Sequence, residues 1–117
     1  MDIGEPEITR SDILVLEDDH FNTNNVCIVT GSGTGIGRAT AIAAAANQLM
    51  TVGLDFNETE GMKTQKMARE MGGQMIFVKT DLCNDADIKH AVAEAAKLGT
   101  IKYVANIAGI QHIDAIE

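Results

Sequence analysis

Residues 30–37, Thr-Gly-Ser-Gly-Thr-Gly-Ile-Gly, decide the fold of this chain. A short apolar and β-branched run precedes them and predicts a buried strand at 26–30. An alanine-rich run follows them and predicts a helix at 35–48. Glycine permits positive φ and leaves no Cβ in the way. Four glycines between a strand and a helix therefore predict a turn whose bare backbone closely approaches another group.

The position of this turn at the start of a helix indicates what it approaches. A helix N-terminus attracts anions through its free N–H groups and its macrodipole. A phosphate cradle, most naturally for the pyrophosphate of a dinucleotide, is the favoured interpretation. The glycines alone leave open a turn that only packs the helix on the strand. A P-loop is not favoured, because no Gly-Lys-Ser/Thr follows the turn.

An acidic residue stands where a dinucleotide site requires one. Such a site places a carboxylate at the end of the next strand, about 20 residues beyond the glycines. Asp55 ends the apolar run at 51–55 and meets this requirement. Its carboxylate would accept hydrogen bonds from the adenosine ribose and repel a 2′-phosphate. Because neither Thr34 nor Phe56 offers a cation to that phosphate, we expect NAD rather than NADP.

Strand and helix patterns alternate along the rest of the chain. Strands are predicted at 75–79 and 101–105, and helices at 58–71 and 85–98. Asn57 is the expected N-cap of the second helix, and Gly72-Gly73 is its expected end. This alternation predicts an α/β fold, a three-layer, Rossmann-like, doubly wound parallel sheet with strand order 3-2-1-4 in the portion present.

Several side chains are expected to pack in the interior. They are methionines of the second helix, one face of the third helix, and both thiols. The three sets are Met62, Met67 and Met71; Ile88, Val92 and Ala96; and Cys27 and Cys83.

Candidate binding residues gather at the carboxyl ends of the strands, where ligands of open α/β sheets bind. Asp81-Leu82 follows the third strand, and residues 106–109 follow the fourth. Two alternatives remain open: Asp81 as the N-cap of the third helix, and Asn106 as a turn residue that bonds local backbone. The predicted cofactor-binding set is Gly31, Ser32, Thr34, Gly35, Ile36, Gly37, Asp55, Phe56, Asp81, Leu82, Asn106, Ala108 and Gly109.

Composition limits the possible partners. The 117 residues carry a formal net charge of −8, and 45% are hydrophobic, as in one small globular domain. The negative charge argues against nucleic acid or an anionic membrane as a partner. No apolar run approaches the length of a membrane span, and the N-terminus lacks the regions of a signal peptide, so we expect a cytoplasmic protein. The consecutive residues 18–20, Asp-Asp-His, are not expected to bind a metal, because no second ligand cluster accompanies them.

Residues 1–25 differ from the rest of the chain. They hold the only proline and many acidic residues, around a short apolar run at 13–16. This acidic arm could pack on the body, pack on a neighbouring subunit, or be mobile. Residues 26–117 are expected to form the N-terminal part of a dinucleotide-binding Rossmann domain.

With these motifs placed, residues 26–117 resemble the short-chain dehydrogenase/reductase family. The turn at 30–37 is similar to its Thr-Gly-x-x-x-Gly-x-Gly motif, Asp55 to its NAD-selecting acid, and Asp81-Leu82 to its adenine-contacting pair. Residues 106–109 resemble its Asn-Asn-Ala-Gly motif, with Ile107 replacing the second asparagine. The resemblance implies an NAD-dependent oxidoreductase that transfers a hydride between nicotinamide and a secondary alcohol or ketone.

Residues 109–112 are similar to the same segment of D-3-hydroxybutyrate dehydrogenases. That similarity implies a substrate contact at Gln111 and 3-hydroxybutyrate as the candidate substrate.

The family's catalytic serine and Tyr-x-x-x-Lys pair would lie beyond residue 117. The only tyrosine, Tyr103, lies in a strand and has Ile107 four places on, so we interpret it as structural. We therefore expect no catalytic residue here, in the first part of a chain of roughly 250 residues that is homo-oligomeric when complete. The alternative is a non-catalytic nucleotide-binding module.

Overall fold

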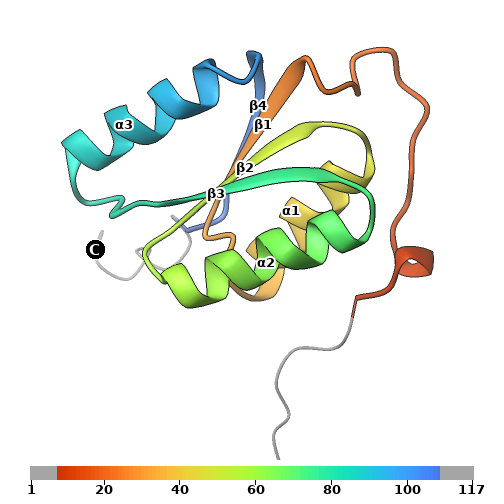
Figure 1. Ribbon diagram of the computed structural model, residues 1–117, viewed down its shortest axis with the longest axis horizontal. Helices are drawn as coiled ribbons and strands as arrows, with labels where there is room; N and C mark the ends of the chain where they lie inside the picture. The colour runs from red at the N-terminus through yellow and green to blue at the C-terminus, as the bar shows by residue number, and fades with distance from the viewer. Residues whose placement is uncertain (1–7, 109–117) are drawn as a thin grey trace, which may run out of the picture.

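The computed structural model describes residues 8–108 (Figure 1). Each strand predicted from the sequence is present and begins one residue earlier than predicted. The elements, in chain order, are the 3-10 helix η1 (Arg10–Asp12), β1 (Asn25–Thr30), α1 (Gly35–Ala46), β2 (Met50–Asp55), α2 (Glu58–Glu70), β3 (Gln74–Lys79), α3 (Asp85–Ala96) and β4 (Thr100–Asn106).

The four strands form one parallel sheet in the order β3-β2-β1-β4, which confirms the predicted topology. Figure 1 shows α1 and α2 on one face of the sheet and α3 on the other. The chain therefore forms the three layers of a Rossmann-like fold, and the carboxyl ends of all four strands meet at one edge.

The central strand β1 is buried on both faces. Val26 and Ile28 pack in the cluster that includes α3, whereas Cys27 and Val29 pack in the cluster that includes α1 and α2. A parallel strand covered on both faces has to be apolar along its whole length. This requirement explains the continuous apolar run that precedes the glycines.

The buried face of α3 differs from the prediction. Ala91 and Ala95 are fully buried, whereas Val92 is 42% exposed and Ala96 is exposed; Ile88 is partly buried. Small side chains let the helix lie close to the sheet. Two rows of residues spaced four apart run along this helix. The row with Ala91 and Ala95 packs on the sheet, and the predicted row with Val92 does not.

The prediction that Met62 packs in the core is also wrong, because this side chain is 45% exposed. The inner face of α2 is formed instead by residues such as Gly61 and Ala68, and a Cβ added at Gly61 would lie 2.0 Å from the Phe77 ring. Met67 and Met71 pack against the core as predicted.

Cys27 is buried in β1, as predicted, but Cys83 is exposed. Cys83 lies between β3 and α3, at the edge of the sheet where loops face solvent. The prediction of a second buried thiol is therefore wrong.

The segment before β1 contacts the body of the molecule. The Asn47 side chain, at the end of α1, accepts a hydrogen bond from the Leu16 amide at 2.6 Å and donates one to the Leu14 carbonyl at 2.9 Å. Ile13 and Phe21 pack against the core beside α1. Part of the predicted acidic arm thus packs on the body, although the Leu14 side chain remains 75% exposed.

β4 is the outermost strand on its side of the described sheet, and it is irregular. Its register shifts between the pairs Val26–Ile101 and Cys27–Tyr103. Tyr103 meets Phe21 edge to face, with ring centroids 6.0 Å apart, which supports its structural interpretation. Val104 is 62% exposed.

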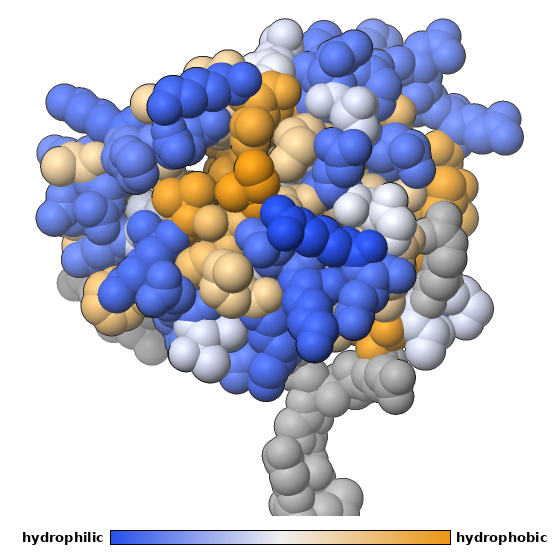
Figure 2. Space-filling view, viewed as in Figure 1, coloured by the Kyte–Doolittle hydropathy of each residue, from blue (hydrophilic) through white to orange (hydrophobic). Residues whose placement is uncertain are grey.

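Figure 2 shows the hydrophilic outer surfaces of α2 and α3, with a hydrophobic band between them on the face toward the viewer. Among residues 8–108, no helix has the length and apolar character needed to span a bilayer.

Candidate dinucleotide-binding site

The glycine-rich turn is fixed to the neighbouring strand by its backbone. The amides of Gly31 and Ser32 both donate to the Leu54 carbonyl of β2, at 2.8 and 3.2 Å. Gly31 and Gly35 have positive φ values of 68° and 58°, a conformation that favours glycine. A Cβ added at Gly37 would lie 1.7 Å from the Gly31 carbonyl oxygen, so α1 begins directly against the turn.

The N-terminus of α1 differs from those of the other two helices. Its N-cap residue, Thr34, makes no side-chain capping hydrogen bond, and its first turn carries no acidic residue. Asn57 caps α2, as predicted, and Asn84 caps α3; both of these helices have acidic residues in the first turn. The positive end of the α1 dipole is therefore not compensated by its own sequence, which suits a bound anion.

Asp55 lies beside this N-terminus. One carboxylate oxygen, Oδ2, accepts a hydrogen bond from the Gly33 amide at 2.9 Å, and Oδ1 accepts one from the Asn57 amide at 2.9 Å. A carboxylate offers about four lone-pair sites, so both oxygens can still accept ribose hydroxyls. A Cβ at Gly33 would lie 2.8 Å from Oδ2, so only glycine allows this approach.

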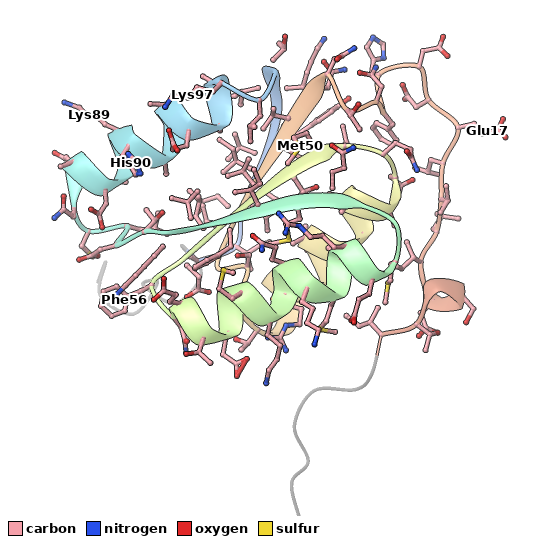
Figure 3. The ribbon with its side chains drawn as sticks, in the orientation of Figure 1. Glu17, Met50, Phe56, Lys89, His90 and Lys97 are labelled. Carbon is pink, nitrogen blue, oxygen red and sulfur yellow. The ribbon has the colours of Figure 1, made fainter. Side chains whose placement is uncertain are left out.

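Two adjoining cavities open at the carboxyl edge of the sheet, and Figure 3 shows Phe56 beyond the strand ends, where α2 and α3 begin. Each is partly open to solvent, has a volume of about 240 Å³, and shares Gly31, Asp55 and Ala108 with the other. The first is lined by Gly31, Asp55, Phe56, Thr80, Asp81, Leu82, Cys83 and Ala108. The second is lined by Gly31, Thr34, Gly35, Ile36, Gly37, Asp55, Ile107 and Ala108.

Asp81 faces the first cavity and does not cap α3. Its Oδ1 accepts from the Cys83 amide at 2.9 Å, and its own amide donates to Asp87 Oδ2 at 2.9 Å. The side chain of Asn84 accepts from the amides of Ala86 and Asp87. The alternative of Asp81 as N-cap is therefore wrong.

Asn106 joins the ends of β4 and β1. Its Oδ1 accepts from the Thr30 hydroxyl at 2.9 Å, and the same hydroxyl accepts from the Ala108 amide at 3.1 Å. Asn106 thus bonds across the sheet as well as lying at a strand end. It lines neither of the two adjoining cavities and instead borders a third, more apolar one with Leu82 and Val104.

Ser32 also lies outside the two cavities. It is fully buried, and its Oγ has no hydrogen-bond partner among residues 8–108. Its amide and its carbonyl are both bonded within the chain, so its contribution is to the shape of the turn. Gly109 and Gln111, predicted as cofactor and substrate contacts, lie outside the described residues.

Three residues that line the cavities were not predicted as ligand contacts: Thr80, Cys83 and Ile107. Thr80 and Cys83 flank the Asp81-Leu82 pair, and Ile107 lies within the motif at 106–109. The position of these three residues beside or within the motifs is the sequence feature that could have identified them. Lys79 lies nearby, with its ammonium nitrogen 5.4 Å from the centre of the Phe56 ring.

The Cys27 thiol lies in the core, apart from both cavities. Burial raises the pKa of the Cys27 thiol to about 11, so that thiol stays protonated at neutral pH. Across residues 8–108, no three His, Cys, Asp or Glu side chains are grouped as metal ligands.

Comparisons with known proteins identify one family. The family described as short chain dehydrogenase matches residues 25–117. A 3beta-hydroxysteroid dehydrogenase of Mediterraneibacter gnavus is 37% identical over 86 residues, which cover 73% of this chain and 31% of that protein. The chain spans about a third of the length of the first curated relatives it matches.

Two similar solved structures contain a dinucleotide. A short chain dehydrogenase/reductase from Burkholderia phymatum in complex with NAD is 29% identical, with a TM-score of 0.68, covering 73% of this chain and 30% of that one. An actinorhodin polyketide ketoreductase variant with NADPH is 25% identical, with a TM-score of 0.68, covering 71% and 32%. With its glycine-rich turn, its acid at the end of β2 and its 3-2-1-4 sheet, this chain belongs to the short-chain dehydrogenase/reductase family.

Proposed function

We propose that residues 26–117 bind NAD and form the cofactor-binding part of an NAD-dependent oxidoreductase. The observation that carries the proposal is the junction of the two cavities. There the Asp55 carboxylate lies beside the N-terminus of α1, whose first turn carries no acidic residue of its own. One feature attracts a diphosphate and the other accepts sugar hydroxyls, and a dinucleotide carries both groups side by side.

Each part of the cofactor has residues that would hold it. The pyrophosphate would lie on the first turn of α1, at Thr34, Gly35 and Ile36. The adenosine ribose would bond Asp55, and the adenine would occupy the cavity bordered by Phe56, Asp81 and Leu82. Gly31, Gly37 and Ala108 have no side chain or a small one, so they would let the cofactor lie close to the protein backbone. Asn106 and Ser32 would shape the site, and Gly109 is proposed as a further contact. When bound, the nicotinamide would supply the hydride acceptor or donor.

The charge distribution favours NAD over NADP. Arg38 is the buried cation closest in sequence to the turn, and its guanidinium is bound to Glu60 at 2.9 Å. Asp55 and Glu60 both lie near Gly33: a Cβ there would be 2.8 Å from Asp55 Oδ2 and 3.2 Å from Glu60 Cβ. A 2′-phosphate would therefore meet the Asp55 carboxylate, which opposes its binding, whereas the charge of Glu60 is already paired with Arg38.

The remaining assignments belong to the whole protein. We propose a secondary alcohol or ketone as substrate, with 3-hydroxybutyrate as the specific candidate and Gln111 as its contact. We further propose a homo-oligomeric, cytoplasmic enzyme without nucleic-acid or membrane partners, with residues 1–25 as a separate acidic arm. The assay for the substrate is NADH formation with 3-hydroxybutyrate and related alcohols.

Direct titration tests the cofactor assignment. The chain is titrated with NADH and with NADPH, followed by fluorescence or calorimetry, and NADH should bind about tenfold more tightly or better. Tighter binding of NADPH, or no binding of either, would overturn the assignment.

A variant pair locates the bound phosphate. Ile36 is 67% exposed and borders the second cavity, so its replacement does not disturb the core. Ile36→Glu places a carboxylate at the α1 N-terminus and should weaken NADH binding about tenfold, through repulsion of the pyrophosphate. Ile36→Gln has nearly the same shape without the charge and should retain most of the affinity. Equal affinities for the two variants would place the pyrophosphate elsewhere.

A further inference from the structure

A buried hydroxyl of α2 contacts the glycine-rich turn from the side opposite β2. Thr64 is fully buried, and its Oγ1 donates to the Ser32 carbonyl oxygen at 2.7 Å. This residue lies 32 positions after the residue it contacts. The turn is therefore held not only by β2 but also by a helix on the outer layer.

Arg38 fixes the direction in which the Thr64 hydroxyl points. The guanidinium Nε donates to Thr64 Oγ1 at 2.9 Å, so the hydroxyl hydrogen is left to donate to a carbonyl. The Ser32 carbonyl oxygen, at 2.7 Å, is the nearest acceptor; those of Glu60 and Gly33 lie at 3.2 and 3.3 Å. Nη2 of Arg38 donates to the carbonyl oxygen of Glu60 at 3.1 Å and to its Oε2 at 2.9 Å. The Glu60 amide donates to Asn57 Oδ1, and this N-cap bond also fixes the first turn of α2.

The peptide unit between Ser32 and Gly33 is consequently held at both ends. Its carbonyl oxygen accepts from Thr64, and its N–H donates to Asp55 Oδ2 at 2.9 Å. A trans peptide is planar, and its C=O and N–H point in opposite directions. Rotation of this unit would break both bonds together, so Thr64 and Asp55 orient the same peptide from opposite sides.

We propose that Thr64, supported by Arg38, is a positioning residue for NAD binding; this inference rests on the function proposed above. Thr64 holds the Ser32–Gly33 peptide in the one orientation that presents the Gly33 N–H to Asp55. That hydrogen bond in turn holds the Asp55 carboxylate toward the ribose. Thr64 itself borders neither adjoining cavity, so its effect on the cofactor is indirect.

Three threonine variants test the inference. Thr64→Val keeps the shape and removes the hydroxyl, and it should weaken NADH binding about fivefold to tenfold. Thr64→Ser restores the hydroxyl and should bind within about twofold of the wild type. Thr51→Val is the matched control, since Thr51 is equally buried but its hydroxyl bonds, among residues 8–108, only the carbonyl of Leu49, just before β2, at 3.3 Å. Its NADH affinity should be unchanged.

A second readout separates positioning from a general loss of stability. If Asp55 loses its orientation, the ratio of NADH affinity to NADPH affinity should decrease in Thr64→Val but not in Thr51→Val. Amide hydrogen exchange of Gly33 in the wild-type chain gives a measurement without any variant, because a peptide held at both ends should exchange slowly.

The outcomes are distinguishable. Unchanged NADH affinity and unchanged cofactor preference in Thr64→Val, or fast exchange at Gly33, would overturn the inference and leave the proposed function standing. Failure of the wild-type chain to bind NADH would overturn the proposed function and the inference with it. Loss of binding in both valine variants, without rescue by serine, would assign Thr64 a purely structural role.

Discussion

The Gly33 amide donates a 2.9 Å hydrogen bond to Asp55 Oδ2, so the acid that ends β2 is fixed to the turn that begins α1. The two residues are 22 positions apart in the sequence, yet this bond joins the two features that we propose to bind the sugar and the phosphate of the cofactor. A carboxylate fixed by a backbone amide loses little further freedom when it binds a ligand. If the cofactor binds as proposed, this contact should therefore contribute to its affinity.

Replacing this carboxylate should change cofactor preference. Asp55→Asn removes the charge with little change of shape, and NADH affinity should fall about tenfold, since hydrogen bonds to charged groups contribute roughly 1.5–3 kcal/mol. NADPH affinity should stay level or rise, because the repulsion of the 2′-phosphate is gone. Titration with both cofactors measures the effect. Asp19→Asn, at an exposed carboxylate before β1, is the control for net charge. An unchanged ratio of the two affinities would contradict the role of Asp55.

The two thiols should react differently and report on site occupancy. Cys83 is exposed and borders the first cavity, whereas Cys27 is buried with its pKa raised to about 11. Maleimide should therefore label Cys83 in the folded chain and Cys27 only after unfolding, because the accessible thiolate is the reactive species. NADH at ten times its dissociation constant should slow Cys83 labelling about tenfold by mass action. Mass spectrometry of the labelled peptides gives both results. If the rate of Cys83 labelling is the same with and without NADH, adenosine does not bind in that cavity.

A buried hydroxyl without a partner should cost stability. Ser32→Ala removes the Oγ that finds no partner among the described residues, and the free energy of unfolding should rise by about 1 kcal/mol. Thr30→Val removes a hydroxyl of the same strand–turn region that bonds both Asn106 and the Ala108 amide, and it should lower that free energy by about 1–2 kcal/mol. Urea denaturation compares the three chains. A loss of stability in Ser32→Ala would show that this hydroxyl has a partner in solution, such as water.

Stability should fall at acidic pH partly through Glu60. The hydrogen bond from Arg38 lowers the pKa of the Glu60 carboxyl below its usual value of 4.5. A group whose pKa is depressed by folding stabilises the folded state above the unfolded pKa, and this contribution is lost as pH falls through the folded pKa. The free energy of unfolding of the wild type, measured with urea, should therefore decrease as the pH is lowered past about 4.5. In Glu60→Gln this decrease should be smaller.

Glu94→Gln is the comparison for this pH effect. The pKa of Glu94 is also lowered, by its hydrogen bond to Lys97, but this pair is more exposed, so solvent screens it more strongly. The loss of unfolding free energy at acidic pH should therefore stay closer to that of the wild type in Glu94→Gln than in Glu60→Gln. Identical pH profiles for Glu60→Gln and the wild type would show that the Arg38–Glu60 pair does not form in solution.

The strands could be predicted because burial on both faces leaves a strong local signal. The apolar run before the glycines and the run ending at Asp55 each became a buried parallel strand. Helix starts were predictable where a capping residue is unambiguous, as at Asn57, but the cap of α3 was not identified. Asn84 and Asp81 both precede that helix, and only the backbone path decides which of them reaches its free amides.

The predictions of helix ends and of buried helix faces were less accurate. The helix predicted to end at residue 48 ends at Ala46, because Gln48 adopts a positive φ of 74° without a glycine to signal it. On α3 the packed stripe contains Ala91 rather than Val92. Hydropathy favours the larger side chain, whereas the short distance between helix and sheet favours the smaller one.

The sequence by itself determined the sheet order, the glycine-rich turn and the position of the acid that accompanies it. Those features follow from periodicity, from the conformations open to glycine, and from the topology of alternating strands and helices. Only the tertiary structure decided that Thr64 and Arg38 hold the turn from behind and that Ser32 faces inward. Their hydrogen bonds join groups on separate elements, and such contacts depend on how the elements pack rather than on any local pattern.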